Sequence, residues 1–213
     1  MREAASASLP VPGARPYHHG DLSRALVQAG RRILEAEGPN GLSLRAVARE
    51  AGVSPAAPYH HFKDKSDLLE AIAKEGWMEL NEAIAKARRE TPEASEAIAN
   101  IGLAYVCFAR DNPALYRVMY RQARDSETME EHAKSPESGW GQVREAIIAA
   151  SGENDELELA LATVAAWCLA HGVAEMAGFK EFDVLKSALG GEEAFIRAVI
   201  QHVGVFVRPL RHA

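Results

Sequence analysis

The stretch that decides the fold spans residues 43–62 and reads SLRAVAREAGVSPAAPYHHF. Apolar residues at helical spacing in its first half predict a short helix, and Ser43 is a natural N-cap for it. Gly52 follows this helix and ends it, because glycine adopts the left-handed conformation without steric cost. Ser54 then caps a second helix that Pro55 begins and that runs to about the end of the stretch. Two short helices joined by a tight turn predict a helix-turn-helix.

The second helix of such a unit enters the major groove of DNA, and the residues around it determine whether it can do so. Pro58 lacks an amide proton and removes one hydrogen bond in the first turn, which should tighten the start of this helix rather than break it. Asp64, between Lys63 and Lys65, is the predicted N-cap of a long helix that runs to about Arg89. The electropositive start of that helix and the two lysines are suited to holding a phosphate.

Three runs in this region match a known pattern: Leu44 to Ser54, Tyr59 to Lys65, and Leu68 with Leu69. Together they resemble the DNA-binding domain of the TetR family of bacterial regulators. The resemblance implies phosphate contacts from the polar residues that flank the second helix, and base contacts from its first residues with Arg45 and His60. The complete set of implied DNA-contacting residues is Arg45, Ser54, Pro55, Ala56, Ala57, Tyr59, His60, His61, Lys63 and Lys65.

Charge is unevenly distributed along the 213 residues. Residues 1–65 carry nine Lys and Arg against six Asp and Glu, a net of +3, whereas the whole chain has a net charge of −6. A basic first third is typical of a nucleic-acid-binding head joined to a body with another role. We therefore expect a flexible arm (1–16), a head (17–65) and a body (66–213). The arm, rich in Ala, Ser and Pro, is either a disordered tail or an extension that reaches DNA.

The body shows helical patterns throughout, and the predicted fold class is all-α with about nine helices, three of them in the head. Two helices, at about 155–179 and 192–208, are apolar on more than one side, which indicates a second buried surface. Pairing them with the same helices of a second copy would form a four-helix bundle. Such a homodimer would set two heads on a palindromic double-stranded operator, about 34–36 Å apart or a multiple of it. A thick core in a monomer is the alternative.

The body also resembles the C-terminal domain of one TetR branch, named for its Trp, His and Gly. The matching runs are Ala104 to Ala109, Asn112 to Met119, and Trp167 with His171 and Gly172. This domain encloses a ligand pocket in the family, and the resemblance implies lining by Tyr105, Phe108, Met119, Tyr120, Trp140, Trp167 and His171. Such a wall suits a small, mainly apolar effector with a hydrogen-bonding group. Ordinary core packing of the same residues is the alternative.

The expected function is a dimeric, sequence-specific transcriptional regulator, and specifically a repressor that the effector releases. A regulator without a ligand is one alternative. An enzyme is the other, in which His171 acts as a base oriented by Glu175, one helical turn away. No nucleophile, phosphate-binding loop or metal cluster accompanies this pair, so we expect no catalytic site, cofactor or metal.

The cysteines and the hydropathy pattern indicate the cellular compartment of the protein. Cys107 and Cys168 lie in apolar stretches and are expected to be buried, reduced thiols. The sequence shows no signal peptide and no run of about 18 apolar residues, so we expect a cytoplasmic protein that spans no membrane.

Overall fold

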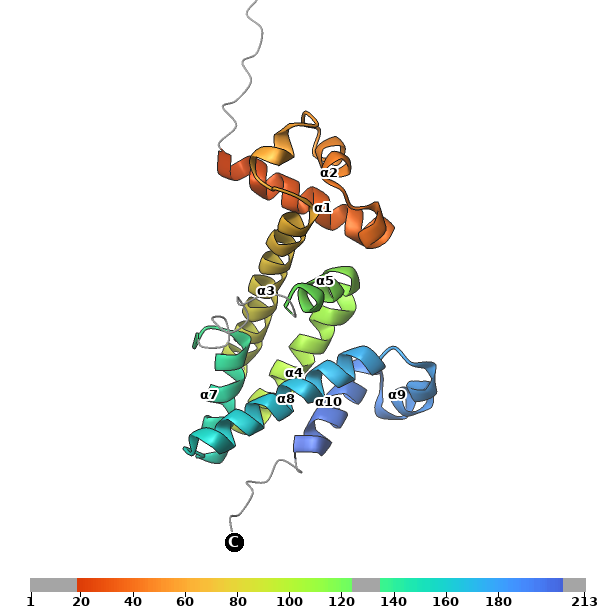
Figure 1. The fold of residues 1–213 in the computed structure, drawn as a ribbon. Coiled ribbons are helices and arrows are strands. Elements are labelled where there is room, and N and C mark those ends of the chain that lie inside the picture. The colour runs from red at the N-terminus through yellow and green to blue at the C-terminus, as the bar shows by residue number, and fades with distance from the viewer. Residues whose placement is uncertain (1–18, 124–134, 205–213) are drawn as a thin grey trace, which may run out of the picture.

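The computed structural model describes residues 19–123 and 135–204, and within these ranges the regular structure is helical throughout (Figure 1). This confirms the predicted all-α fold class. The predicted arm and the last part of the final predicted helix lie outside the described residues. In chain order the elements are α1 (His19–Gly41), α2 (Leu44–Glu50), η1 (Ala57–His60), α3 (Lys65–Arg89), α4 (Ala94–Asp111), α5 (Pro113–Ala123), α7 (Gly139–Ser151), α8 (Glu156–Met176), η2 (Lys180–Phe182), α9 (Asp183–Leu189) and α10 (Glu192–Gly204).

The turn between α2 and η1 forms as the sequence predicts. Ser43 Oγ accepts a hydrogen bond from Ala46 N at 3.1 Å and so caps the start of α2. Gly52 follows α2 with φ of +68°, the left-handed conformation that only glycine adopts cheaply. Val53 N donates to Ala48 O at 2.9 Å, which closes the turn.

The second helix of the unit is shorter and tighter than predicted. It is a 3₁₀ turn, η1, because its hydrogen bonds join residues three apart, as from Tyr59 N to Ala56 O at 3.2 Å. Pro58 supplies no amide proton, so an α-helical bond cannot form there, and only a few residues remain before the chain turns into α3. The prediction of an α-helix of about two turns was therefore wrong, although its position was right.

The first helix, α1, is interrupted near its end. It begins at His19, and Gly38 interrupts it with φ of +70° and ψ of −174°. Pro39 follows directly, so the chain bends here even though helical residues continue to Gly41. The bend brings Pro39 O within 2.5 Å of Lys65 Nζ at the start of α3.

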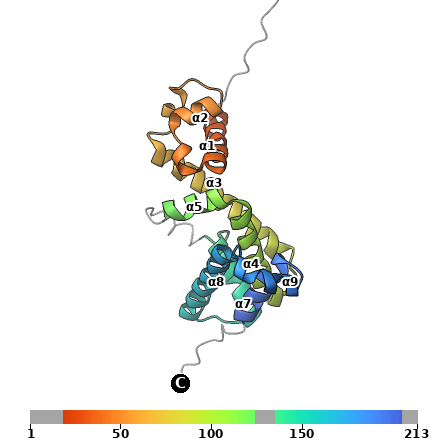
Figure 2. The ribbon, with the colours of Figure 1, turned by 90° about the vertical axis from the view of Figure 1, so that its right-hand side faces the viewer.

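The helix α3 connects the head to the body. Its N-cap is Asp64, whose carboxylate accepts from Ser66 N at 2.8 Å and Asp67 N at 3.0 Å. Figure 2 shows the head and the body as two masses that α3 joins, with α5 beside the junction. Two side-chain links fix α1 to α3: Arg31 donates two hydrogen bonds to Glu79, and Gln28 donates to Glu75 at 2.8 Å.

The body packs α4, α5, α7, α8 and α10 around a common core that includes Tyr105, Met119 and Ile196. The approach of α5 to α3 is tight at Gly76, where a Cβ atom would lie 2.6 Å from Met119 Sδ. Glycine at this position therefore permits the contact between the two helices. The short helices η2 and α9, between α8 and α10, were not predicted from the sequence.

One face of α8 is buried and the other is exposed although it is apolar. Thr163 and Trp167 face the body, whereas Leu157, Leu161 and Val164 are 63%, 48% and 46% exposed. In the described residues α8 is the one helix long and apolar enough to cross a membrane, with a mean hydropathy of 1.6. Its exposed residues lie at the seven-residue spacing of a helix-pairing seam.

Both cysteines are free thiols, but their burial differs from the expectation. Cys168 is exposed on the open face of α8, so the prediction that it is buried was wrong. Cys107 is half-buried, and burial raises the pKa of its thiol, which keeps it protonated and unreactive at neutral pH.

Candidate functional site

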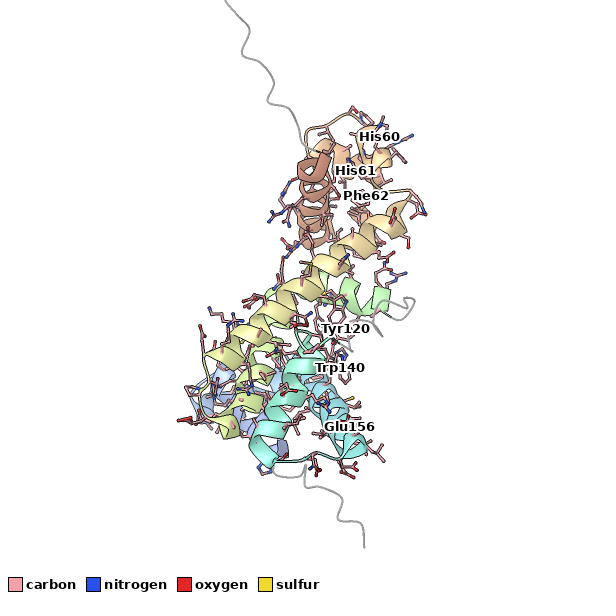
Figure 3. The ribbon with its side chains drawn as sticks, turned by 90° about the vertical axis from the view of Figure 1, so that its left-hand side faces the viewer. His60, His61, Phe62, Tyr120, Trp140 and Glu156 are labelled. Atoms are coloured by element: carbon pink, nitrogen blue, oxygen red, sulfur yellow. The ribbon has the colours of Figure 1, made fainter. Side chains whose placement is uncertain are left out.

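The residues predicted to contact DNA gather at the end of the head. Tyr59 is 55% exposed although it is aromatic, and His60 projects from the end of the head remote from the body (Figure 3). Also exposed are Arg45, Ser54, Pro55, Ala56 and Lys63, whereas Ala57, His61 and Lys65 are half-buried. Pro58 and Phe62 instead face inward and anchor η1 to the core. The turn therefore presents a mixed aromatic, imidazole and small-residue surface.

The two lysines beside Asp64 have different surroundings. Lys63 N donates to Asp67 Oδ2 at 2.9 Å, which orders the start of α3, while its side chain is exposed. Lys65 Nζ donates to Pro39 O at 2.5 Å, so this ammonium already holds the end of α1. Because an ammonium group has three donors, Lys65 keeps two for a phosphate. Lys63 is thus an exposed cation, and Lys65 also has a structural contact.

In the body, side chains from α4, α5 and α8 meet in a hydrogen-bonded aromatic cluster. The hydroxyl of Tyr105 bonds those of Tyr116, at 2.9 Å, and Tyr120. Tyr116 also lies 2.5 Å from His171 Nδ1. Trp167 Nε1 donates to the Tyr120 hydroxyl at 3.1 Å. The aromatic cluster comprises these five residues, Tyr105, Tyr116, Tyr120, Trp167 and His171.

One order of donors satisfies every hydroxyl proton of the aromatic cluster. Every hydroxyl proton has an acceptor if Trp167 donates to Tyr120, Tyr120 to Tyr105, Tyr105 to Tyr116, and Tyr116 to His171. In this order His171 accepts at Nδ1 and carries its own proton at Nε2. Burial raises the pKa of all three tyrosines, so they remain protonated donors at neutral pH.

Four of the seven predicted pocket residues, Tyr105, Tyr120, Trp167 and His171, belong to the aromatic cluster. Trp140 stacks on Trp167, with ring centroids 4.9 Å apart and planes 14° apart. Phe108 is buried in the core, and Met119 is fully buried at the contact with Gly76. Tyr116 was not among the predicted pocket residues, although it lies within a quoted run, because periodicity marks a core-facing residue without showing where its hydroxyl points.

Two cavities adjoin these aromatic residues. An apolar cavity of about 80 Å³ borders Tyr105 and Trp167 and is otherwise lined mainly by aliphatic and small residues. A groove of about 400 Å³ lies between α7 and α8, and it is bordered by Trp140, Arg144 and Val164. The volume of the groove lies in the range typical of small-molecule sites, whereas the volume of the apolar cavity is smaller.

Comparison with known proteins decides the family. The model of "Bacterial regulatory proteins, tetR family" matches residues 26–72, and that of "Tetracyclin repressor-like, C-terminal domain" matches residues 98–202. The chain belongs to the TetR family. Its helix-turn-helix and helical body are accordingly those of a DNA-binding transcriptional regulator, as the sequence predicted. The narrower assignment to the Trp-His-Gly branch stays a prediction.

Solved structures with the TetR fold resemble the whole described chain. A protein of unknown function from Rhodococcus sp. RHA1 is 30% identical, with a TM-score of 0.73 over 93% of this chain and 100% of that one. A regulatory protein in the TetR family from Rhodococcus RHA1 is 24% identical, with a TM-score of 0.63 over 90% and 97%. The TetR family regulator PfmR from Thermus thermophilus is 19% identical, with a TM-score of 0.59 over 88% and 99%.

Removing the central hydroxyl of the aromatic cluster tests how far it stabilises this TetR-family body. Tyr105→Phe leaves the half-buried Tyr120 hydroxyl without the Tyr105 hydroxyl as its partner, so we expect the free energy of unfolding to fall by about 1–2 kcal/mol. Urea denaturation followed by circular dichroism measures this. Tyr116→Phe serves as the comparison, because it also removes a hydroxyl from the cluster but leaves the Tyr105–Tyr120 bond in place. Equal stability of Tyr105→Phe and wild-type protein would show that the hydrogen bonds of the Tyr105 hydroxyl do not stabilise the body.

Proposed function

We propose that the protein is a homodimeric, cytoplasmic repressor that binds a palindromic operator and is released by a small effector. The observation that carries the DNA-binding part is the exposure of Tyr59 and His60 on η1, beside buried Pro58 and Phe62. An element that recognises DNA bases needs one side packed on the core of the head and the other side exposed to the groove. In this proposal residues 1–16 form an arm, 17–65 the DNA-binding head and 66–213 the effector-binding and dimerisation body.

The exposed residues of the head divide into two roles. Lys63, Lys65, Ser54 and Tyr59 are placed to bind phosphates and thereby fix the orientation of the head. The small side chains at the start of the turn (Pro55, Ala56 and Ala57) allow close approach to base edges, and an alanine methyl packs well on the thymine methyl group. Arg45, His60 and His61 would provide the polar contacts on either side.

A binding selection tests the proposal as a whole. Random double-stranded DNA incubated with the full chain should yield one enriched palindrome, and footprinting should protect two half-sites about 10–10.5 base pairs apart or a multiple of it. Enrichment of no sequence, with binding equal on all fragments, would contradict a sequence-specific regulator.

The salt dependence of operator binding tests the role of Lys63. Lys63→Ala should lower the slope of log K against log salt concentration by about one unit, because one fewer counterion is released. Lys74→Ala is the control, since this lysine is exposed on α3 beyond the head and should leave the slope unchanged. Electrophoretic mobility shifts between about 50 and 200 mM salt cover the range over which such slopes are measured. An unchanged slope for Lys63→Ala would remove this residue from the phosphate contacts.

Dimer formation is supported by the exposed apolar stripe on α8. Leu157, Leu161, Val164 and Cys168 lie on the side opposite the buried Leu159 and Val173. A soluble monomer rarely exposes a contiguous stripe of this kind, and a second copy covers it by helix pairing. In the proposed dimer α10 adds the second helix from each copy.

Effector release is supported by the position of the aromatic cluster. Tyr120 and Met119 are neighbours on α5; the ring of Tyr120 contacts Trp77 of α3 at a centroid distance of 5.2 Å, and Met119 packs against Gly76. A ligand that displaces Tyr120 therefore acts on the helix that carries the head. Such a ligand shifts DNA binding only if it binds one arrangement of α5 and α3 more tightly than the other.

The enzyme alternative has little support. The hydrogen bonds that His171 makes within the described residues join it to Tyr116 and Tyr105, and no described hydrogen bond joins it to Glu175. A structural role, as the last acceptor in the series of tyrosine hydroxyls, therefore accounts for His171 without catalysis.

A further inference from the structure

The start of the η1 turn is a short apolar surface on the head. Pro55 and Ala56 are exposed and Ala57 is half-buried, and none of the three side chains forms hydrogen bonds. These three residues are named the apolar tip. The next residue, Pro58, is buried and fixes the apolar tip to the core of the head. His60 follows closely in the chain, and Figure 3 places it at the end of the head remote from the body.

The backbone of the apolar tip offers few donors. Pro55 has no amide proton, and Ala57 N donates to Ser54 O at 3.0 Å. Ala56 N is left without a described acceptor. Amides at the start of helical turns contact phosphate oxygens in protein–DNA complexes, and such contacts carry no sequence information. The apolar tip therefore presents methyl and methylene groups to a base edge.

The surroundings of the apolar tip fit a polyanion that has apolar groups between its charges. Arg45 and Lys63, on the segments before and after the apolar tip, are exposed cations. The major groove of DNA has this character, because phosphates line its sides and the base edges lie between them. In a TetR-family regulator, the partner that matches both the cations and the apolar tip is double-stranded DNA.

The base edges differ in what an apolar surface can complement. In the major groove guanine presents two acceptors, adenine an acceptor and an amino group, and cytosine an amino group, whereas thymine adds a C5-methyl group. Covering a hydrogen-bonding group with a surface that cannot pair with it costs free energy. Covering a methyl group instead removes apolar area from water and is favourable. The C5-methyl group of a pyrimidine is therefore the group that suits the apolar tip.

We propose that the apolar tip recognises the C5-methyl group of a pyrimidine in each half-site of the operator. Ala56, the exposed alanine, contacts thymine there, and 5-methylcytosine can replace that thymine because it carries a methyl group on the same ring atom. This inference rests on the proposed DNA-binding function and specifies the base chemistry that the head selects. Methylation of a cytosine at this position would create a contact instead of blocking one.

Operator duplexes that differ by single methyl groups test the proposal with the wild-type chain. In the operator obtained by selection, each thymine is replaced in turn by uracil, which lacks only the C5-methyl group. For at least one thymine of each half-site the Kd should rise about fourfold, the factor that corresponds to one buried carbon group of this size. Mobility shifts at fixed salt concentration measure it. Half-sites without thymine, or an operator whose affinity no uracil changes, would overturn the proposal.

Cytosine methylation is the reverse test. Replacing the most sensitive T·A pair by C·G should weaken binding, and 5-methylcytosine in that C·G pair should recover about fourfold in affinity. The methylated and unmethylated duplexes have the same base pairs, so the methyl group alone accounts for a difference between them. Equal affinities for these two duplexes would contradict recognition of the methyl group.

Ala56→Gly assigns the contact to the apolar tip. Without the alanine methyl group, the thymine duplex and its uracil counterpart should bind with equal affinity. Lys63→Ala is the control, because loss of a phosphate contact should weaken both duplexes and leave their ratio unchanged. A thymine preference that persists in Ala56→Gly would overturn the assignment. The uracil and 5-methylcytosine measurements use the wild-type chain, so they do not depend on how this variant folds.

The proposed function and this inference fail in different ways. A chain that enriches no DNA sequence defeats the proposed function, and this inference with it. A chain that binds its operator equally well with every thymine replaced by uracil defeats this inference alone.

Discussion

Leu161→Glu is expected to convert the dimer into a monomer and to abolish operator binding at concentrations at which the wild-type chain binds. Leu161 is 48% exposed in the middle of the apolar stripe of α8. Pairing of this stripe would bury the introduced carboxylate in an apolar interface, which costs several kcal/mol without a partner charge. A single head then loses the roughly 10²–10⁴-fold gain that linked binding to two half-sites provides.

Sedimentation and mobility shifts measure the two effects of Leu161→Glu in parallel. Met78→Glu is the matched control, because Met78 is also an exposed apolar residue, 61% exposed, but lies on α3. It should leave both the mass in solution and the operator affinity unchanged. A Leu161→Glu chain that sediments as a dimer would show that α8 is not the interface, and the apolar stripe would then need another explanation.

Gly76→Val is expected to lower the free energy of unfolding by about 3 kcal/mol, the upper part of the range for overpacked cores. A Cβ at this position would lie 2.6 Å from Met119 Sδ and 3.0 Å from Leu115 Cδ1, so α5 must move away from α3 or Met119 must leave its position. Met119 is fully buried and has little space to move into. In a chain of this size the loss corresponds to a fall in Tm of about 6–12 °C.

Gly172→Ala provides the comparison for Gly76→Val. A Cβ at Gly172, also within a helix, would meet nothing within 4 Å. This change should therefore raise stability by about 0.5–1 kcal/mol, as alanine favours helix over glycine. Calorimetric unfolding of both variants measures these two changes in stability. If Gly76→Val melted at the same temperature as the wild-type chain, the tight contact between α3 and α5 would not contribute to the fold.

The features that the sequence predicted well depend on residues close together in the chain. Ser43, Gly52 and Asp64 act on groups no more than a few residues away, so their types suffice to place the helix ends. Pro58 was recognised, but its effect was underestimated. A missing hydrogen bond matters little in a long helix, whereas it removes much of the hydrogen bonding available to a stretch of about eight residues.

The arrangement of the aromatic cluster could not be predicted in the same way. Tyr105, Tyr116 and His171 are 11 to 66 residues apart, and their hydrogen bonds depend on how α4, α5 and α8 cross. Helical periodicity shows that a side chain faces inward without showing which partner it meets. The family resemblance supplied most of the residues but not Tyr116, because it provides positions and not the direction of hydroxyl groups.

The links from Arg31 to Glu79 and from Gln28 to Glu75 join α1 of the head to α3 as far as Glu79. A helix of 25 residues is about 37 Å long. Rotation of such an arm by only about 6° moves its far end by about 4 Å, which exceeds the roughly 3.4 Å rise of one base pair. A displacement at the junction that is much smaller than a side chain would thus move the η1 turns of the two copies out of register with the DNA.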